Sequence, residues 1–262
     1  MFLWGPPGTG KSLGAQLVAS RLNLPLISLE WGAILGVASP DIALSRILAA
    51  VESIAPCILY FDDFDKGFAG WDSDADGGVA LRLAGKLLVW LQEHRATVYT
   101  IATVNRIVML PPELKRCLDE VFFMDYPHNG ARHKILKAHL SQYFAPFQAA
   151  DPWSDRQWRK LLTLAQNFSP AEIGGVVKRL AERKFYELYQ AGLVDADASP
   201  PLAAAYEELL LAFRQTIPLK ARPDGQEQVE EMQQNRDFAK PAAAPDRSIF
   251  AKSENVRLYE CN

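Results

Sequence analysis

Near the start of the chain, glycines and prolines run into a lysine and a serine, in the order Gly5-Pro-Pro-Gly-Thr-Gly-Lys11-Ser12. Glycines let a backbone curl so that successive N–H groups point at phosphate oxygens. In this spacing the lysine reaches the outer phosphates of a nucleotide, and the serine hydroxyl coordinates Mg²⁺. We therefore expect ATP to be bound by Gly5, Pro6, Pro7, Gly8, Thr9, Gly10, Lys11 and Ser12.

A pair of carboxylates, Asp62 and Asp63, follows the apolar run Ile58–Phe61. An acid at the carboxyl end of a buried strand lies in the crevice where open α/β sheets bind ligands. We expect Asp62 to hold Mg²⁺ opposite Ser12, and Asp63 to polarise the attacking water. The alternative is that Asp63 only caps a loop, because aspartate is one methylene shorter than the glutamate common at this position.

Asn105 ends another apolar run, Ile101–Val104. From a neighbouring strand end, its amide would orient the lytic water or contact the γ-phosphate. An isolated asparagine is more often a turn former. The catalytic interpretation of Asn105 therefore depends on the two motifs described above.

Short apolar runs alternate with helical patterns over the first 125 residues, which predicts βαβ units and a parallel sheet. Continuous apolar strands indicate that helices cover both faces of this sheet. Candidate strands are Phe2–Trp4, Leu26–Leu29, Cys57–Phe61, Val98–Thr103 and Val121–Met124. Candidate helices lie near Lys11–Leu22, Asp41–Ile54 and Val79–His94.

Beyond Pro127 the strand signals stop and helical periodicity takes over. We predict an α/β P-loop core at 1–127, a small all-helical lid at 128–214 and a low-order polar tail at 215–262. The predicted lid helices are Ala131–Tyr143, Asp155–Gln166, Ala171–Ala191 and Leu202–Arg214.

Composition excludes several classes of protein. The net charge is −3 and the pI is near 5.9, so we expect no nucleic-acid partner.

No run reaches the roughly 20 apolar residues of a membrane-spanning helix, and Met1–Trp4 does not begin a secretory signal peptide. Cys57, Cys117 and Cys261 form neither a disulfide framework nor a metal pattern, which indicates a reducing compartment. The segment Asp72–Gly77 is interpreted as an acidic surface loop rather than a calcium site.

Taken together, these motifs resemble an AAA+ ATPase of the classical AAA branch. Gly5–Ser12 matches Walker A, Asp62 and Asp63 match Walker B, Asn105 matches sensor 1, and Leu110-Pro-Pro-Glu-Leu114 and a helical lid follow. The sequences of the segments Ala55–Lys66 and Leu110–Tyr126 most resemble those of AAA+ proteins that are encoded by a conserved open reading frame of cyanobacteria and algal plastids. This resemblance implies an Mg·ATP hydrolase in a homo-oligomeric ring or beside a partner AAA+ chain. It also implies a protein substrate and a location in bacterial cytoplasm or plastid stroma.

The sequence departs from that family at several places. Asp63 stands where the family has glutamate, and the long region that family members carry before Walker A is absent, so we expect a core that lacks its upstream part. After Pro-Glu-Leu the family carries arginines that reach the ATP of the next subunit. In Pro112–Glu120 only Arg116 remains as a candidate for that role. The segment Trp31–Ser39 lacks the aromatic-apolar-glycine pattern that grips a threaded protein.

Two functions from different classes remain open. The first is an ATPase that uses turnover to remodel a protein partner. The second is an ATP-binding switch or scaffold with weak or no hydrolysis, which the Asp63 substitution and the shortened segment around Arg116 favour. A nucleic-acid-dependent ATPase is disfavoured by the acidic balance.

Overall fold

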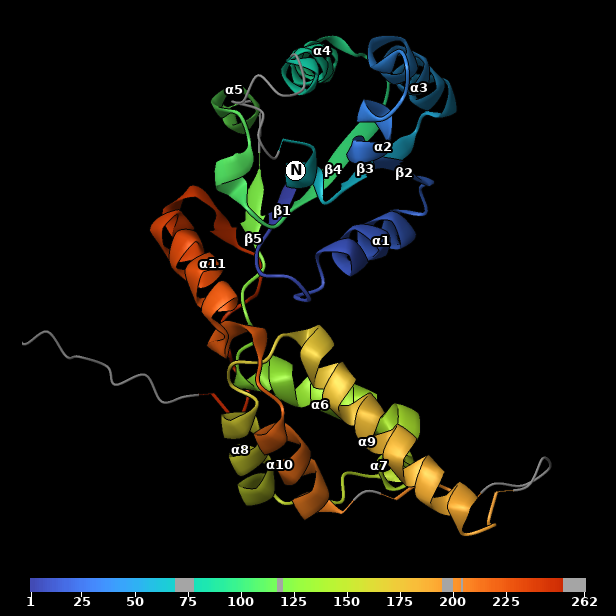
Figure 1. Ribbon diagram of the computed structural model, residues 1–262, viewed down its shortest axis with the longest axis vertical. Coiled ribbons are helices and arrows are strands. Elements are labelled where there is room, and N and C mark those ends of the chain that lie inside the picture. The colour runs from blue at the N-terminus through green and yellow to red at the C-terminus, as the bar shows by residue number, and fades with distance from the viewer. Residues whose placement is uncertain (69–77, 117–119, 195–199, 204, 252–262) are drawn as a thin grey trace, which may run out of the picture. The chain divides into compact units, whose positions relative to one another are not determined.

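The structure is a computed structural model that describes residues 1–68, 78–116, 120–194, 200–203 and 205–251 (Figure 1). These residues form two compact units. The first contains Met1–Asp125 and Glu227–Ala243, and the second contains Tyr126–Gln226 and the described residues from Ala244 onward. The predicted acidic loop Asp72–Gly77 lies outside the described residues.

The first unit is built on a six-stranded sheet in which every pairing is parallel. Its spatial order is β2-β3-β4-β1-β5-β6. The predicted parallel α/β core is therefore confirmed. The strands are β1 Phe2–Trp4, β2 Leu26–Glu30, β3 Cys57–Asp62, β4 Val98–Val104, β5 Val121–Phe123 and β6 Lys240–Pro241.

Helices cover both faces of this sheet (Figure 1). On one face α1 (Lys11–Leu22) packs its buried alanines with Leu3, Ile58 and other side chains of the same strand face. On the other face α3 (Pro40–Ile54) and α4 (Val79–Glu93) pack on the alternate residues of the same strands, such as Leu59. Side chains of a strand alternate between faces, so burial of both faces requires the unbroken apolar runs of the sequence.

A cluster of aromatic rings fixes the turn that follows β3. Trp31 begins the short helix α2 (Trp31–Leu35) and is 1% exposed. Its ring lies 5.1 Å from that of Phe64 and 5.6 Å from that of Phe68, both in the 3-10 helix η1 (Phe64–Phe68). Trp31 is thus a core residue, which agrees with the absence of a pore-loop pattern in its segment.

The second unit is helical, as predicted. One of its helices, α9, starts with a capping box, in which Ser169 and Glu172 satisfy each other's backbone N–H groups. Among the described residues, none of the helices combines the length and the apolar character that a bilayer crossing needs. The helices are α6 Asn129–Tyr143, α7 Pro146–Ala149, α8 Asp155–Leu164, α9 Pro170–Gln190 and α10 Tyr206–Gln215.

The structure corrects part of the expectation of low order for residues 215–262. Helix α11 (Pro223–Gln234) buries Met232 in the core of the first unit, and β6 extends the sheet beside β5. The segment is attached largely by polar contacts, including the Lys240–Glu120 ion pair at 2.7 Å. A composition argument counts apolar residues, so it could not detect a helix held by one methionine and charged pairs. Residues 252–262 lie outside the described residues.

Met232 provides a direct test of this docking. Met232 is 2% exposed, so Met232→Ala should lower the free energy of unfolding of the chain by about 2–5 kcal/mol, through lost burial and a cavity. Urea denaturation followed by circular dichroism measures this change. The neighbouring exposed residue supplies the control, since Gln233→Ala should change stability by less than about 0.5 kcal/mol. Equal stability of the two variants would contradict the docking of α11.

Candidate functional site

The loop Gly5–Ser12 connects β1 to α1 and depends on its glycines. Gly5, Gly8 and Gly10 have φ values of 153°, 77° and 97°, which side-chain-bearing residues rarely adopt. A Cβ atom on Gly5 would also lie 2.3 Å from the carbonyl oxygen of Met124. The sequence therefore builds a tight backbone loop that ends at the N-terminus of a helix, where a phosphate is favourably bound.

Lys11 lies folded against this loop. Its ammonium donates to the carbonyl oxygens of Gly5, at 2.8 Å, and Pro6, at 2.9 Å. Thr9 also donates its hydroxyl to Pro6. Burial lowers the pKa of Lys11 to about 8, although nearby carboxylates oppose the shift. The loop thus holds a cation whose hydrogen bonds to carbonyl oxygens a phosphate can replace.

Asp62 stands at the carboxyl end of β3 and accepts three side-chain hydrogen bonds on Oδ1. The donors are the hydroxyls of Ser12 at 3.2 Å, Tyr60 at 2.7 Å and Thr103 at 2.7 Å. Desolvation raises the pKa of Asp62, but these hydrogen bonds outweigh it and hold the pKa below its ordinary value. Asp62 is therefore an anion that faces the start of α1.

The residues fit a magnesium ion. Ser12 and Asp62 offer a hydroxyl and a carboxylate, the hard oxygen ligands that Mg²⁺ prefers. Among the described residues, no group of three or more His, Cys, Asp and Glu is arranged to hold a metal alone. Ser12 and Asp62 suit Mg²⁺ because this ion is usually bound by one or two carboxylates, water and substrate phosphates.

Asp63 is fixed through both its backbone and its side chain. It adopts a left-handed conformation with φ 46°, and its N–H donates to Thr103 Oγ1 at 2.9 Å. Oδ1 accepts from Asn105 Nδ2 at 2.7 Å, and Oδ2 accepts from Lys66 Nζ at 2.5 Å. The structure thus brings together Asp63 and Asn105, which the sequence predicts at neighbouring strand ends.

Thr103 and Asp65 complete the site, and neither was predicted from the sequence. Thr103 is fully buried and bridges the Asp62 carboxylate and the Asp63 backbone. Asp65, 2% exposed, accepts the backbone N–H groups of Asn105 and Arg106 at 3.1 and 3.0 Å. Burial raises the pKa of Asp65, against these hydrogen bonds. A polar residue inside the apolar run of β4 was the available signal for Thr103, whereas nothing local marks Asp65 as buried.

Residues 1–126 match the model of the AAA family, described as ATPases associated with various cellular activities. Through these residues the chain is similar to the AAA family. The protein ycf46 of Pyropia yezoensis, described as an uncharacterised AAA domain-containing protein, is 34% identical over 237 residues, which cover 89% of this chain and 44% of that protein. The cell division cycle protein 48 homologue of Archaeoglobus fulgidus is 28% identical over 204 residues, 76% of this chain and 27% of that protein.

Solved structures agree on the fold. The crystal structure of the FIGL-1 AAA domain matches with a TM-score of 0.72 and 15% identity, over 91% of this chain and 77% of that one. The same domain in complex with ADP gives a TM-score of 0.70. These comparisons confirm the predicted family resemblance and the AAA fold. The chain spans less than half the length of the curated relatives it matches.

One predicted residue of the AAA domain stays apart from the others. Arg116 ends the short helix α5 (Pro112–Arg116), and its side chain is exposed. Hydrogen bonds and ion pairs among the described residues do not join it to Lys11 or to Asp62. The role of Arg116 as an arginine finger therefore stays a prediction.

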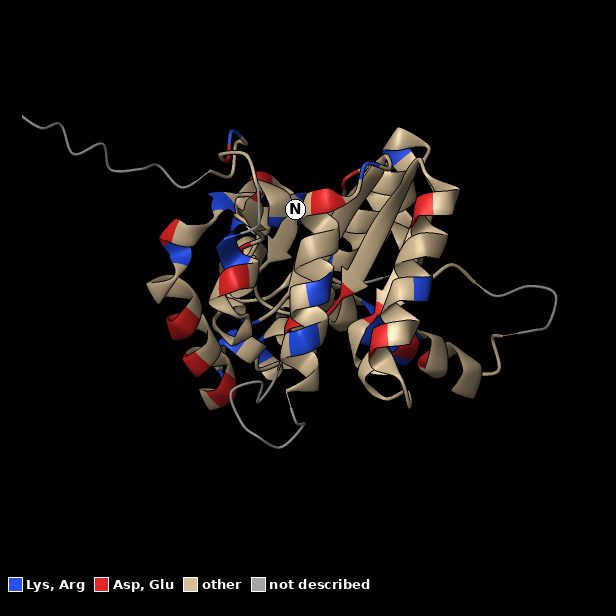
Figure 2. Cartoon of the chain, turned by 90° about the horizontal axis from the view of Figure 1, so that it is seen from above, with Lys and Arg blue, Asp and Glu red and all other residues tan. Residues whose placement is uncertain are grey.

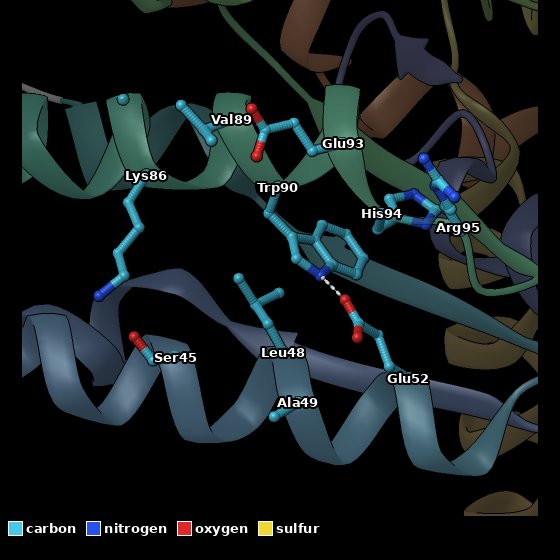
Figure 3. Close-up of a pocket in the computed structure, with 11 residues that line it drawn as sticks. Ser45, Leu48, Ala49, Glu52, Lys86, Val89, Trp90, Glu93, His94 and Arg95 are labelled. Atoms are coloured by element: carbon cyan, nitrogen blue, oxygen red, sulfur yellow. Dashed lines mark hydrogen bonds between the residues drawn. The ribbon is translucent and has the colours of Figure 1, made fainter.

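A separate cavity of about 640 Å³ lies between α3 and α4 (Figure 3). Trp90 projects between the two helices and donates Nε1–H to Glu52 at 2.5 Å. The charged groups in its lining balance, with Glu52 and Glu93 against Lys86 and Arg95. None of the predicted phosphate-binding residues lines it, so this cavity is distinct from the candidate site of the AAA domain.

The pKa of Lys11 gives a prediction for nucleotide binding. Because free Lys11 loses its proton around pH 8 and a bound polyphosphate favours the ammonium, ATP binding should take up a proton above pH 8. Affinity should then fall as pH rises, by up to about tenfold per pH unit. Calorimetry at pH 7 and pH 9, in buffers of different ionisation enthalpy, measures both effects. Lys11→Met should bind weakly without proton uptake, and uptake in that variant would disprove the assignment.

Proposed function

We propose that the AAA domain binds Mg·ATP between the Gly5–Ser12 loop and the carboxyl ends of β3 and β4, and hydrolyses it. The observation that carries this proposal is a continuous path of hydrogen bonds. It runs from Ser12 to Asp62, on to Thr103 and Asp63, and then to Asn105. These hydrogen bonds fix the Gly5–Ser12 loop relative to the polar side chains at the ends of β3 and β4. Hydrolysis requires such fixed positions, because the attacking water has to be oriented toward the bound phosphate.

Each side chain then has one task. Lys11 and the backbone N–H groups of Gly8, Thr9 and Gly10 bind the phosphates, and Ser12 and Asp62 hold Mg²⁺. The bound metal neutralises part of the charge that develops on the phosphates. Asp63 accepts a proton from the attacking water, and Asn105 orients that water and the carboxylate together.

The alternative function, an ATP-dependent binding switch with weak hydrolysis, has its own support. Both carboxylate oxygens of Asp63 are already engaged by side chains, at 2.5 and 2.7 Å. Aspartate is also shorter than glutamate, so the position of a water relative to the base is altered. Under this alternative, Mg·ATP stabilises one arrangement of the domain for a partner without repeated turnover.

The partner that we propose is a protein, acted on by a ring of copies of this chain or by a ring shared with another AAA chain. This proposal rests on the family resemblance. In Figure 2, Lys and Arg are interspersed with Asp and Glu on the elements drawn. A nucleic-acid-binding surface instead gathers Lys and Arg on one face, so this distribution favours a protein partner. The ycf46 relatives support a plastid location, whereas the alternative of bacterial cytoplasm rests on the family resemblance.

Asp63 distinguishes the two functions. Asp63→Asn keeps the Oδ1 acceptor but removes the base, so turnover should fall at least about 100-fold while ATP affinity changes little. Asp63→Glu tests whether the shorter side chain limits the rate. Steady-state phosphate release and nucleotide titration measure the two quantities. An inert wild-type chain that gains activity with Asp63→Glu would establish the switch in place of the ATPase.

Arg116 tests action between copies of the chain. Arg116→Ala should reduce kcat by on the order of 10³-fold with unchanged ATP affinity, if its guanidinium stabilises the transition state in a neighbour. Mixing this variant with Lys11→Ala chains should then restore part of the activity, since one copy supplies ATP and the other the arginine. Arg46→Ala, an exposed arginine on α3, is the control. Full activity of Arg116→Ala would refute the role.

A further inference from the structure

Lys66 makes an ion pair with the residue that we propose as the catalytic base. It lies in η1, three residues after Asp63, and its Nζ is 2.5 Å from Asp63 Oδ2. The hydrogen bond and the charge of Asp63 raise the pKa of Lys66, so Lys66 remains an ammonium at neutral pH. The side chain of Lys66 is 71% exposed and that of Asp63 is 38% exposed.

This ion pair acts on the group that has to accept a proton. A carboxylate polarises water through an unshared oxygen lone pair, and a donor already bound to that oxygen competes with the water for the lone pair. With Asn105 on Oδ1 and Lys66 on Oδ2, the carboxylate of Asp63 is turned toward two donors. The Asn105 contact comes from a strand end held by the buried Asp65, whereas the Lys66 contact comes from a solvent-exposed side chain.

We propose that Lys66 is a positioning residue that restrains Asp63, and that bound Mg·ATP weakens this ion pair without abolishing it. This inference rests on the proposed ATPase function. Lys66 therefore slows hydrolysis in those Mg·ATP complexes in which the pair persists.

The exposure of the pair makes such a weakening feasible. An ion pair between exposed side chains contributes little net stability and is screened by salt. The phosphates of ATP bring several negative charges to the neighbouring Lys11 loop and compete for the ammonium of Lys66. Asp65, in contrast, is buried and accepts two backbone N–H groups, so it stays fixed while Lys66 moves.

The restraint that Lys66 places on Asp63 is measured through the rate of ATP hydrolysis. Lys66→Met removes the ammonium and should raise kcat at saturating Mg·ATP about two- to fivefold, which corresponds to the usual strength of an exposed pair. Wild-type kcat should rise between 50 mM and 500 mM salt, whereas Lys66→Met should show no such rise. Lys66→Arg should behave as wild type. Lys178→Met, which breaks an exposed ion pair with Glu182 on α9, is the matched control and should leave kcat unchanged. A lower kcat in Lys66→Met, or an unchanged salt response, would overturn the proposal.

A second measurement reads the pair without turnover. The ¹⁵N resonance of the Lys66 ammonium, assigned by its loss in Lys66→Arg, should shift when Mg²⁺ and a non-hydrolysable ATP analogue are added. Asp63→Asn removes the partner carboxylate of Lys66, so the resonance in that variant marks the position of the unpaired ammonium. Binding of the analogue should move the wild-type resonance toward that position. Calorimetry under the same conditions reports binding. A bound analogue with an unmoved Lys66 resonance would overturn this inference alone, whereas absence of binding would overturn the proposed function as well.

Discussion

The hydroxyl of Thr103 is the contact on which the candidate site depends. It donates to the Asp62 carboxylate and accepts the N–H of Asp63, so one buried group of β4 fixes both acids at the end of β3. Burying a hydroxyl costs free energy unless its hydrogen bonds are made. The Thr103 hydroxyl makes two, one as donor and one as acceptor. The left-handed backbone of Asp63 is held in this way, and with it the direction of its side chain.

Strand order explains why so few contacts are enough. β3, β4 and β1 are neighbours, and parallel strands end at the same edge of a sheet. The Asp62–Asp63 pair, Asn105 and the Gly5–Ser12 loop follow these three strands, so each is delivered to that edge by the sheet itself. Aromatic packing of Trp31 against η1 then sets the turn that carries Asp65 and Lys66. Packing of the apolar core therefore also fixes the positions of the polar side chains at this edge of the sheet.

Several parts of this arrangement were predictable because they follow from local rules. The glycine spacing identified the loop, and the apolar period gave helix α1 with the bounds Lys11–Leu22. Parallel strand ends brought Asn105 to Asp63. The burial of Asp65 and the pairing of Lys66 depend on the 3-10 turn and on packing, which local sequence does not reveal. Residues 217–251 escaped prediction because a few separated side chains, such as Met232 and Phe250, are the buried anchors in a polar segment.

The return of residues 227–243 to the first unit has a consequence for how this protein can be divided. The peptide passes between the two units at three places, after Asp125, after Gln226 and after Ala243. No contiguous stretch of sequence therefore contains the whole first unit and nothing else. A fragment that stops before Glu227 keeps the Gly5–Ser12 loop but turns β5 into a bare sheet edge, with backbone groups open to pairing with other chains. The edge of the sheet beside β5 is thus covered by a strand of only two residues that follows β5 more than a hundred residues later in the chain.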